Sequence, residues 1–252
     1  MAYNALVRMP LTRWGVLPAL LALVLAAQDT PRRLAVEEIV GRMVRADDGR
    51  AAAMGGYTGK RRYRFENKRA NKRAEIVVRL TCTRAGVKTF QVLSGSGSAF
   101  VRSHVLQKMI EAEAESSRRS DREQSRILPK NYAFRLIGTA TSEGRPAYLL
   151  DLIPKTKNQF LIRGRVWVDA EDYAVTRIEG SPAKNPSFWI KSVKIVQRYG
   201  KIGPFWLPVL NSSSAEARVF STTDVTIEYF DYVLENRTPA RPSTATPAAR
   251  PK

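Results

Sequence analysis

The 252-residue sequence has few of the residues that most often carry chemistry, with one cysteine, Cys82, and one histidine, His104. A single cysteine excludes an intramolecular disulfide, and one cysteine with one histidine cannot by themselves furnish a zinc site. A serine–histidine or cysteine–histidine mechanism would have to be built around His104, which has no nucleophile motif beside it. We therefore expect no catalytic residue, no metal and no cofactor, and we do not expect an enzyme.

Motifs for binding a phosphate, activating a nucleophile or binding calcium are also absent. The glycine-rich run 94–98 lacks the lysine of a phosphate-binding loop and does not match a nucleophile elbow, which favours a hairpin turn. Asp169, Glu171 and Asp172 lack the glycine and the distal glutamate of a calcium-binding loop, which favours an ordinary acidic turn. Cys82 continues the alternation of Ile76, Val78 and Leu80, which is typical of a buried structural thiol. An exported hydrolase stays as an alternative, to be tested by His104→Ala.

Long hydrophobic runs are also scarce. The one near the start, 14–27, has fourteen uncharged residues after Arg8 and Arg13, whereas a membrane-spanning helix needs about 20. This pattern predicts a cleaved signal peptide over 1–27, with a retained anchor as the alternative. No cysteine stands directly after the cleavage site to carry a lipid anchor, so we expect a soluble protein of the periplasm.

Acidic residues are outnumbered, with 23 against 42 lysines and arginines and a net charge of +19. Residues 1–27 hold two arginines and no acid, so the charge falls to +17 when they leave. In the cytosol this charge would suggest nucleic acid. Outside the inner membrane the abundant polyanions are lipid headgroups and surface polymers, so we expect an anionic membrane surface as partner and no nucleic acid.

The rest of the chain divides into a domain over 28–236 and a basic, Pro/Ala-rich tail over 237–252, which we expect to be disordered. Thr30 and Pro31 are placed to begin an amphipathic helix, with Val36, Ile39, Val40, Met43 and Val44 at helical spacing. A second helix is expected at about 104–117, followed by a charged loop over 118–126. Alternating apolar residues predict eleven strands: 57–66, 74–83, 88–93, 99–102, 132–138, 148–153, 160–169, 174–179, 187–199, 206–211 and 223–234.

These elements predict a mainly β (α+β) fold: a single curved antiparallel sheet that forms an open half-barrel, covered by an N-terminal helix and a second helical insertion. The apolar strand faces are candidates to line a concavity that holds a hydrophobic ligand. They comprise Phe65, Ile76, Val78, Leu80, Phe90, Val92, Phe134, Leu136, Leu150, Leu152, Phe160, Ile162, Val166 and Val168. Alternation indicates burial and not a cavity, so a closed core remains the alternative.

A basic stretch spans the first expected hairpin, where eight cations stand against one acid, Glu66. The cations are Lys60, Arg61, Arg62, Arg64, Lys68, Arg69, Lys72 and Arg73. Like charges this dense repel each other unless an anion lies nearby, so the stretch is either a solvated face or a surface that binds anionic headgroups.

The arrangement resembles the periplasmic outer-membrane lipoprotein-sorting and lipoprotein-carrier family of the LolA/LolB type. The resemblance rests on the helix after the signal, the strand meander, the helical insertion, and the segment 164–169 (GRVWVD) followed by 173–179 (YAVTRIE). It implies a carrier, or chaperone in protein transport, that shields the acyl chains of lipoproteins or another lipid and moves them toward the outer membrane. A membrane transporter complex or outer-membrane acceptor is then a further expected partner. The alternative is an envelope-stress sensor or interaction module of the same fold that binds a membrane protein.

Overall fold

A computed structural model describes residues 35–118, 125–185, 190–217 and 222–235. The expected signal peptide, the Thr30–Pro31 helix start, most of the charged loop and the basic tail lie outside the described residues. None of the described helices is both long enough and apolar enough to cross a lipid bilayer.

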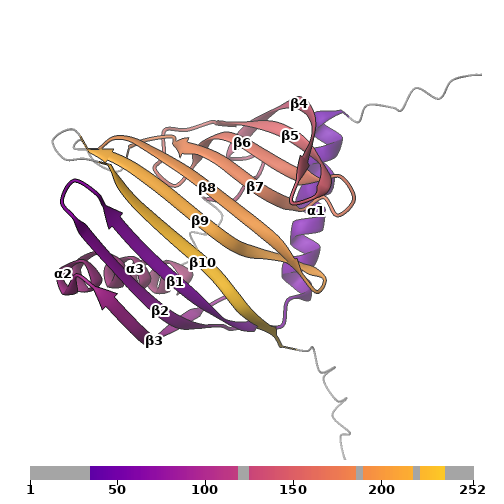
Figure 1. Ribbon diagram of the computed structural model, residues 1–252. Coiled ribbons are helices and arrows are strands. Elements are labelled where there is room, and N and C mark those ends of the chain that lie inside the picture. The colour runs from indigo at the N-terminus through magenta and orange to yellow at the C-terminus, as the bar shows by residue number, and fades with distance from the viewer. Residues whose placement is uncertain (1–34, 119–124, 186–189, 218–221, 236–252) are drawn as a thin grey trace, which may run out of the picture. The chain divides into compact units, whose positions relative to one another are not determined.

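The described chain forms one antiparallel sheet of ten strands (Figure 1). The strands are β1 (Tyr57–Asn67), β2 (Lys72–Cys82), β3 (Lys88–Gly97), β4 (Tyr132–Ser142), β5 (Arg145–Pro154), β6 (Ile162–Asp169), β7 (Val175–Pro182), β8 (Ile190–Ile202), β9 (Phe205–Ala217) and β10 (Thr223–Leu234). Their spatial order is β3-β2-β1-β10-β9-β8-β7-β6-β5-β4, so the first strand pairs with the last. The edge strands β3 and β4 do not pair with each other within the described ranges, and the sheet is open. The expected fold class is confirmed.

The helices are α1 (Val36–Ala53), α2 (Ala99–Val101), the π-helical turn η1 (Arg102–Leu106) and α3 (Gln107–Arg118). Helix α1 has Glu37 and Glu38 in its first turn, where carboxylates offset the helix dipole. The strand expected over 99–102 is wrong, because this segment is helical. Ser98 Oγ accepts a hydrogen bond from Val101 N, and the buried side chains of Val101, Leu106 and Ile110 then pack on the sheet as one helical edge.

One row of side chains shows how each face of the sheet is used. Antiparallel partners directly opposite each other point to the same face. The registers give one row across all ten strands: Leu136, Leu150, Val166, Ile178, Gln197, Asn211, Ile227, Tyr63, Ile76 and Gly95. We call the face that carries this row the inner face. The adjacent row on the outer face begins Arg135, Asp151, Arg165 and Glu179, so that face is charged.

The inner face carries two separate apolar cores. Ile39, Val40 and Met43 of α1 pack on the inner residues of β4 to β7, and this cluster is the α1 core. Val101, Leu106 and Ile110 pack on β1, β2 and β10, and this cluster is the α3 core. Figure 1 shows α1 beside β4 to β7, and α2 and α3 beside β1 to β3. Between the cores the row is polar at Gln197 and Asn211, so the expected single apolar concavity is interrupted.

Candidate functional site

A hollow of about 410 Å³ lies beneath α1, between that helix, the segment 125–128 and the inner face of the sheet. Its apolar walls are Met43, Val44, Ile127, Leu128, Tyr132, Leu152, Phe160, Ile162, Ala174, Val175 and Ile178. Its polar lining is Asp47, Arg50, Ser125, Arg126, Gln197, Tyr199 and Trp206. The volume falls in the lower part of the 300–1,000 Å³ range of small-molecule sites.

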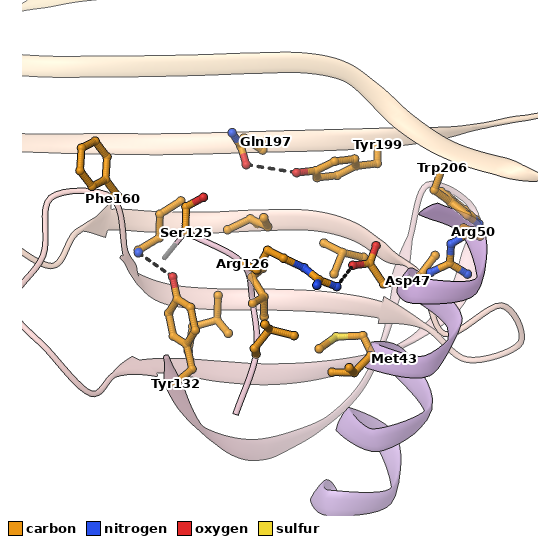
Figure 2. A pocket seen from close by; sticks show the side chains of 18 residues that line it. Met43, Asp47, Arg50, Ser125, Arg126, Tyr132, Phe160, Gln197, Tyr199 and Trp206 are labelled. Atoms are coloured by element: carbon orange, nitrogen blue, oxygen red, sulfur yellow. Dashed lines mark hydrogen bonds and ion pairs between the residues drawn. The ribbon is translucent and has the colours of Figure 1, made fainter. Parts of the chain in front are cut away.

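Elements far apart in the sequence hold this hollow open. Tyr132 sits at the start of β4, and its hydroxyl accepts a hydrogen bond from the backbone N–H of Ile162 at 3.0 Å (Figure 2). Arg126 donates to Asp47 at 2.8 Å and to Asp48 at 2.6 Å, which ties the 125–128 segment to α1. The helix therefore stands off the sheet on polar contacts at its C-terminal end, while Ile39 and its neighbours pack directly.

The polar end of the hollow gathers around Asp172. Arg50 donates to the carbonyl oxygen of Asp172 at 3.0 Å, and the Trp206 indole donates to the Asp172 carboxylate at 2.9 Å. Lys201 donates to the same carboxylate at 2.7 Å and lowers its pKa. Burial, together with the negative charge of Asp47, raises the pKa of Tyr199 to about 12, so this phenol stays neutral at ordinary pH.

The fourteen residues expected to line a concavity do not act as one wall. Leu152, Phe160 and Ile162 line the hollow. The packed cores take the larger share: Leu150, Leu152, Val166, Val168, Phe134, Leu136 and Ile162 in the α1 core; Ile76, Val78, Phe65 and Phe90 in the α3 core; and Leu80 beside Tyr57 and Cys82. Val92 is 59% exposed and Phe160 61% exposed, so neither is buried.

Phe160 differs from expectation because β6 begins at Ile162, two residues later. Its backbone N–H binds the side chain of Asn158 in a turn, which takes its ring out of the strand alternation. The hollow also uses residues that strand alternation could not identify. Met43 and Val44 belonged to the apolar stripe of the N-terminal helix, and that stripe was the available signal.

The basic stretch is divided between the two faces of β1. Arg61 points to the inner face, is 3% exposed, and donates to Glu113 of α3 at 2.5 Å. The prediction that Arg61 binds an anionic surface is therefore wrong. Arg62 and Arg64 lie on the outer face with Glu75 and Glu228. Lys60 pairs with Asp231 and Arg73 with Glu66. Glu113, Glu228 and Asp231 are thus acids that tertiary pairing supplies from distant parts of the chain.

Three of the eight cations keep a free charge. Lys68, Arg69 and Lys72 are exposed at the β1–β2 turn, and no described carboxylate forms an ion pair with them. We call these three the cationic turn. It is the part of the basic stretch that remains available to an anionic surface.

The acidic residues at 169–172 form a structural turn. Asp169 is 1% exposed, its Oδ1 accepts from the backbone N–H groups of Glu171 and Asp172, and Arg145 donates to both carboxylate oxygens. Burial alone raises the pKa of Asp169, but these hydrogen bonds outweigh it and the pKa is lowered. Among the described residues no group of three or more His, Cys, Asp or Glu is placed to hold a metal ion.

His104 does not form a nucleophile site with its neighbour. Its Nδ1 lies 2.8 Å from Ser103 Oγ, but that hydroxyl is also within hydrogen-bond distance of the carbonyl oxygens of Ala99 and Phe100. The imidazole is exposed and stacks on Phe100, and no carboxylate in the described ranges contacts it. Among the described residues, the pair therefore has no carboxylate as the orienting third group of a catalytic triad.

No protein-family model matches the sequence, and no curated protein matches it either. Among solved structures, a DUF1329 family protein from Desulfovibrio piger is 14% identical and has a TM-score of 0.39, over 79% of this chain and 93% of that one. A domain from Vibrio parahaemolyticus, provisionally assigned as an outer membrane lipoprotein-sorting protein, is 10% identical with a TM-score of 0.38 and the same coverage. A LolA superfamily protein from Nitrosomonas europaea is 10% identical with a TM-score of 0.33, over 81% and 95%.

The resemblance expected from the sequence is therefore found among solved structures as a distant likeness. At these identities and TM-scores, the function has to be derived from this chain's own residues.

Proposed function

We propose that this protein binds the acyl chain of a lipoprotein or another lipid in the hollow beneath α1 and carries it through the periplasm toward the outer membrane. The observation that carries the proposal is the hollow itself, where apolar side chains of α1, β5, β6 and β7 converge without filling the space. Each methylene that leaves water there gains about 0.8 kcal/mol. No covalent step is involved.

The size of the hollow limits the cargo. A volume of about 410 Å³ suits one acyl chain, or part of one, better than several chains side by side. The polar residues Gln197 and Asn211 at the centre of the inner row keep the hollow from merging with the α3 core. We therefore expect one chain per protein.

The test places a carboxylate on either face of the sheet. Ile162→Glu puts the charge in the hollow, where bound cargo would deny it water, so fluorescent fatty-acid binding should fall at least about tenfold. Ile153→Glu makes the same change on the outer face of the sheet, because Ile153 is exposed and its β5 neighbour Leu152 points into the hollow. Fatty-acid binding should persist in this variant. Thermal melting of both variants checks that they fold.

Val166→Glu is the contrasting variant, because Val166 is fully buried in the α1 core. It should destabilise the protein by several kcal/mol, enough to unfold a typical domain. If Ile162→Glu folds and binds fatty acid like the parent, the hollow is not the binding site.

A second candidate function is an interaction module that pairs with an extended segment of a membrane protein. The edge strand β3 favours it: residues 91–97 are exposed, Val92 is 59% exposed, and residues 89–97 carry no charge or proline to block pairing. A photo-crosslinker at Val92, compared in cells with one at Thr139 on the other edge strand, tests this. An adduct specific to Val92 that is lost in Leu93→Pro supports the module, and equal labelling at both edges contradicts it.

A further inference from the structure

A second hollow adjoins the first beneath α1. It has a volume of about 330 Å³ and shares Asp47, Arg50 and Trp206 with the first. Its remaining walls are Ala51, Met54, Cys82, Thr83, Arg84, Gly86 and Phe205. Met43, Asp47 and Arg50 lie on one face of α1, since they follow one another at intervals of three or four residues, and the C-cap residue Met54 comes four residues after Arg50. Since this face lines first one hollow and then the other, the two lie end to end along α1.

The two ends of this slot differ in charge. Within the described ranges, Arg50 donates to the carbonyl oxygens of Asp172 and Tyr173 and forms no ion pair with a carboxylate, and Arg84 has no ion pair there either. The acid in the shared wall, Asp47, is already paired with Arg126. The second hollow therefore carries an excess of positive charge.

The far end of the first hollow is apolar by contrast. Figure 2 shows Phe160 and Tyr132 at the end opposite Arg50 and Trp206. Leu152 and Ile162 line the same hollow. A ligand that fits both ends is apolar along most of its length and anionic at one tip.

We propose that the slot takes a single-chain amphiphile with an anionic head group. Its acyl chain lies in the first hollow, and its head group lies in the second, within reach of the Arg84 and Arg50 guanidinium groups. Guanidinium N–H groups bind carboxylate or phosphate oxygens by charge-assisted hydrogen bonds. The inference deepens the proposed function and rests on it, since it assigns the cargo to lipids with a charged head.

Trp206 marks the boundary between chain and head. Its indole lines both hollows and is fixed by its hydrogen bond to Asp172. An indole ring offers an apolar face to a chain and a polar edge to a head group, which suits a boundary position.

The experiment compares head groups on one chain length. Palmitate, palmitoyl lysophosphatidic acid and neutral monopalmitin each displace a fluorescent fatty acid from the purified protein, below their micelle concentrations and at low salt. The two anionic lipids should bind about fivefold or more tightly than monopalmitin, the scale of one exposed ion pair. Arg84→Gln should remove about that factor for the anions and leave monopalmitin unchanged. If only one of the two anionic lipids binds more tightly than monopalmitin, the proposal is supported, and that lipid identifies the head group that the site binds as a carboxylate or a phosphate.

The matched control is Arg163→Gln, which removes the same charge from the outer face of the sheet. Arg163 is exposed, and its β6 neighbour Ile162 points into the first hollow. Arg163→Gln should change none of the three affinities. Equal binding of neutral and anionic lipids to the parent, or equal losses in Arg84→Gln and Arg163→Gln, would overturn the head-group assignment and leave the carrier function standing. If none of the three lipids binds, the carrier function fails as well.

Discussion

Neutralising Glu113 should destabilise the fold with little change in side-chain shape. Its carboxylate on α3 accepts from buried Arg61 at 2.5 Å and from Lys88 of β3 at 2.6 Å. Burial raises the pKa of Glu113, but the two cations outweigh burial and the pKa is lowered, so the group is ionised at neutral pH. Glu113→Gln keeps the volume of the side chain and leaves Arg61 without its counter-charge.

The expected loss follows from how deeply each partner is buried. Removing one partner of a buried ion pair costs about 3–5 kcal/mol, because the other charge stays in a poorly solvated site. Arg61 is 3% exposed, whereas Glu113 is 28% exposed, so water can partly relieve the defect. The rings of Tyr229 and Phe90 lie 4.7 and 5.3 Å from the guanidinium and also stabilise it. We therefore expect a loss of about 2–3 kcal/mol.

Urea denaturation of the purified protein measures this loss. The matched control is Glu111→Gln on the same helix, where the ion pair with Lys108 is exposed and should contribute little to stability. Arg61→Met combined with Glu113→Gln removes both charges and should recover part of the stability. If Glu113→Gln and Glu111→Gln unfold at the same urea concentration, the buried pair does not stabilise the contact between α3 and the sheet.

Three further predictions concern pH, strand packing and the membrane. Asp169 and Glu113 have lowered pKa values in the folded protein, so both carboxylates stabilise the fold fully at pH values above their ordinary pKa values. This stabilisation is lost as the pH falls through the lowered pKa values of the folded protein. The urea concentration at the unfolding midpoint should therefore decrease when the pH is lowered below about 4, and it should decrease less steeply in Glu113→Gln. Gly164→Ala should lower the free energy of unfolding by about 1–3 kcal/mol, because the new Cβ would lie 1.9 Å from the Glu179 carbonyl oxygen. The control Gly138→Ala should leave stability nearly unchanged, because its Cβ would meet nothing within 4 Å. Thermal melting of both variants measures the difference. Replacing all three residues of the cationic turn by Gln should weaken binding to anionic vesicles and flatten its salt dependence, since such attraction decays over about 10 Å at 0.1 M salt; unchanged binding would make the turn an ordinary solvated surface.

Local patterns were sufficient for most of the elements and for which face each strand buries. A period of two residues places Leu150 and Leu152, or Ile76 and Val78, on one face wherever the strand pairs, because successive side chains alternate across a sheet. The same reasoning gave a strand over 99–102, which is wrong, because a run of four residues is too short to distinguish the period of a strand from that of a helix. There the Ser98 cap and the packing of Val101, Leu106 and Ile110 on the sheet, across the π-helical turn η1, favour the helix.

The tertiary structure alone decided which strands are neighbours, and the site depends on that order. Pairing of β1 with β10 brings Glu228 and Asp231, which lie far away in the chain, beside Lys60, Arg62 and Arg64. It therefore supplies acids to three of the eight cations of the basic stretch. Burial of Arg61 requires a helix that the chain places over β1 only after β3. The hollow likewise joins α1 to β4 through β9, and no local period encodes contacts of that range, because they arise when distant faces are packed together.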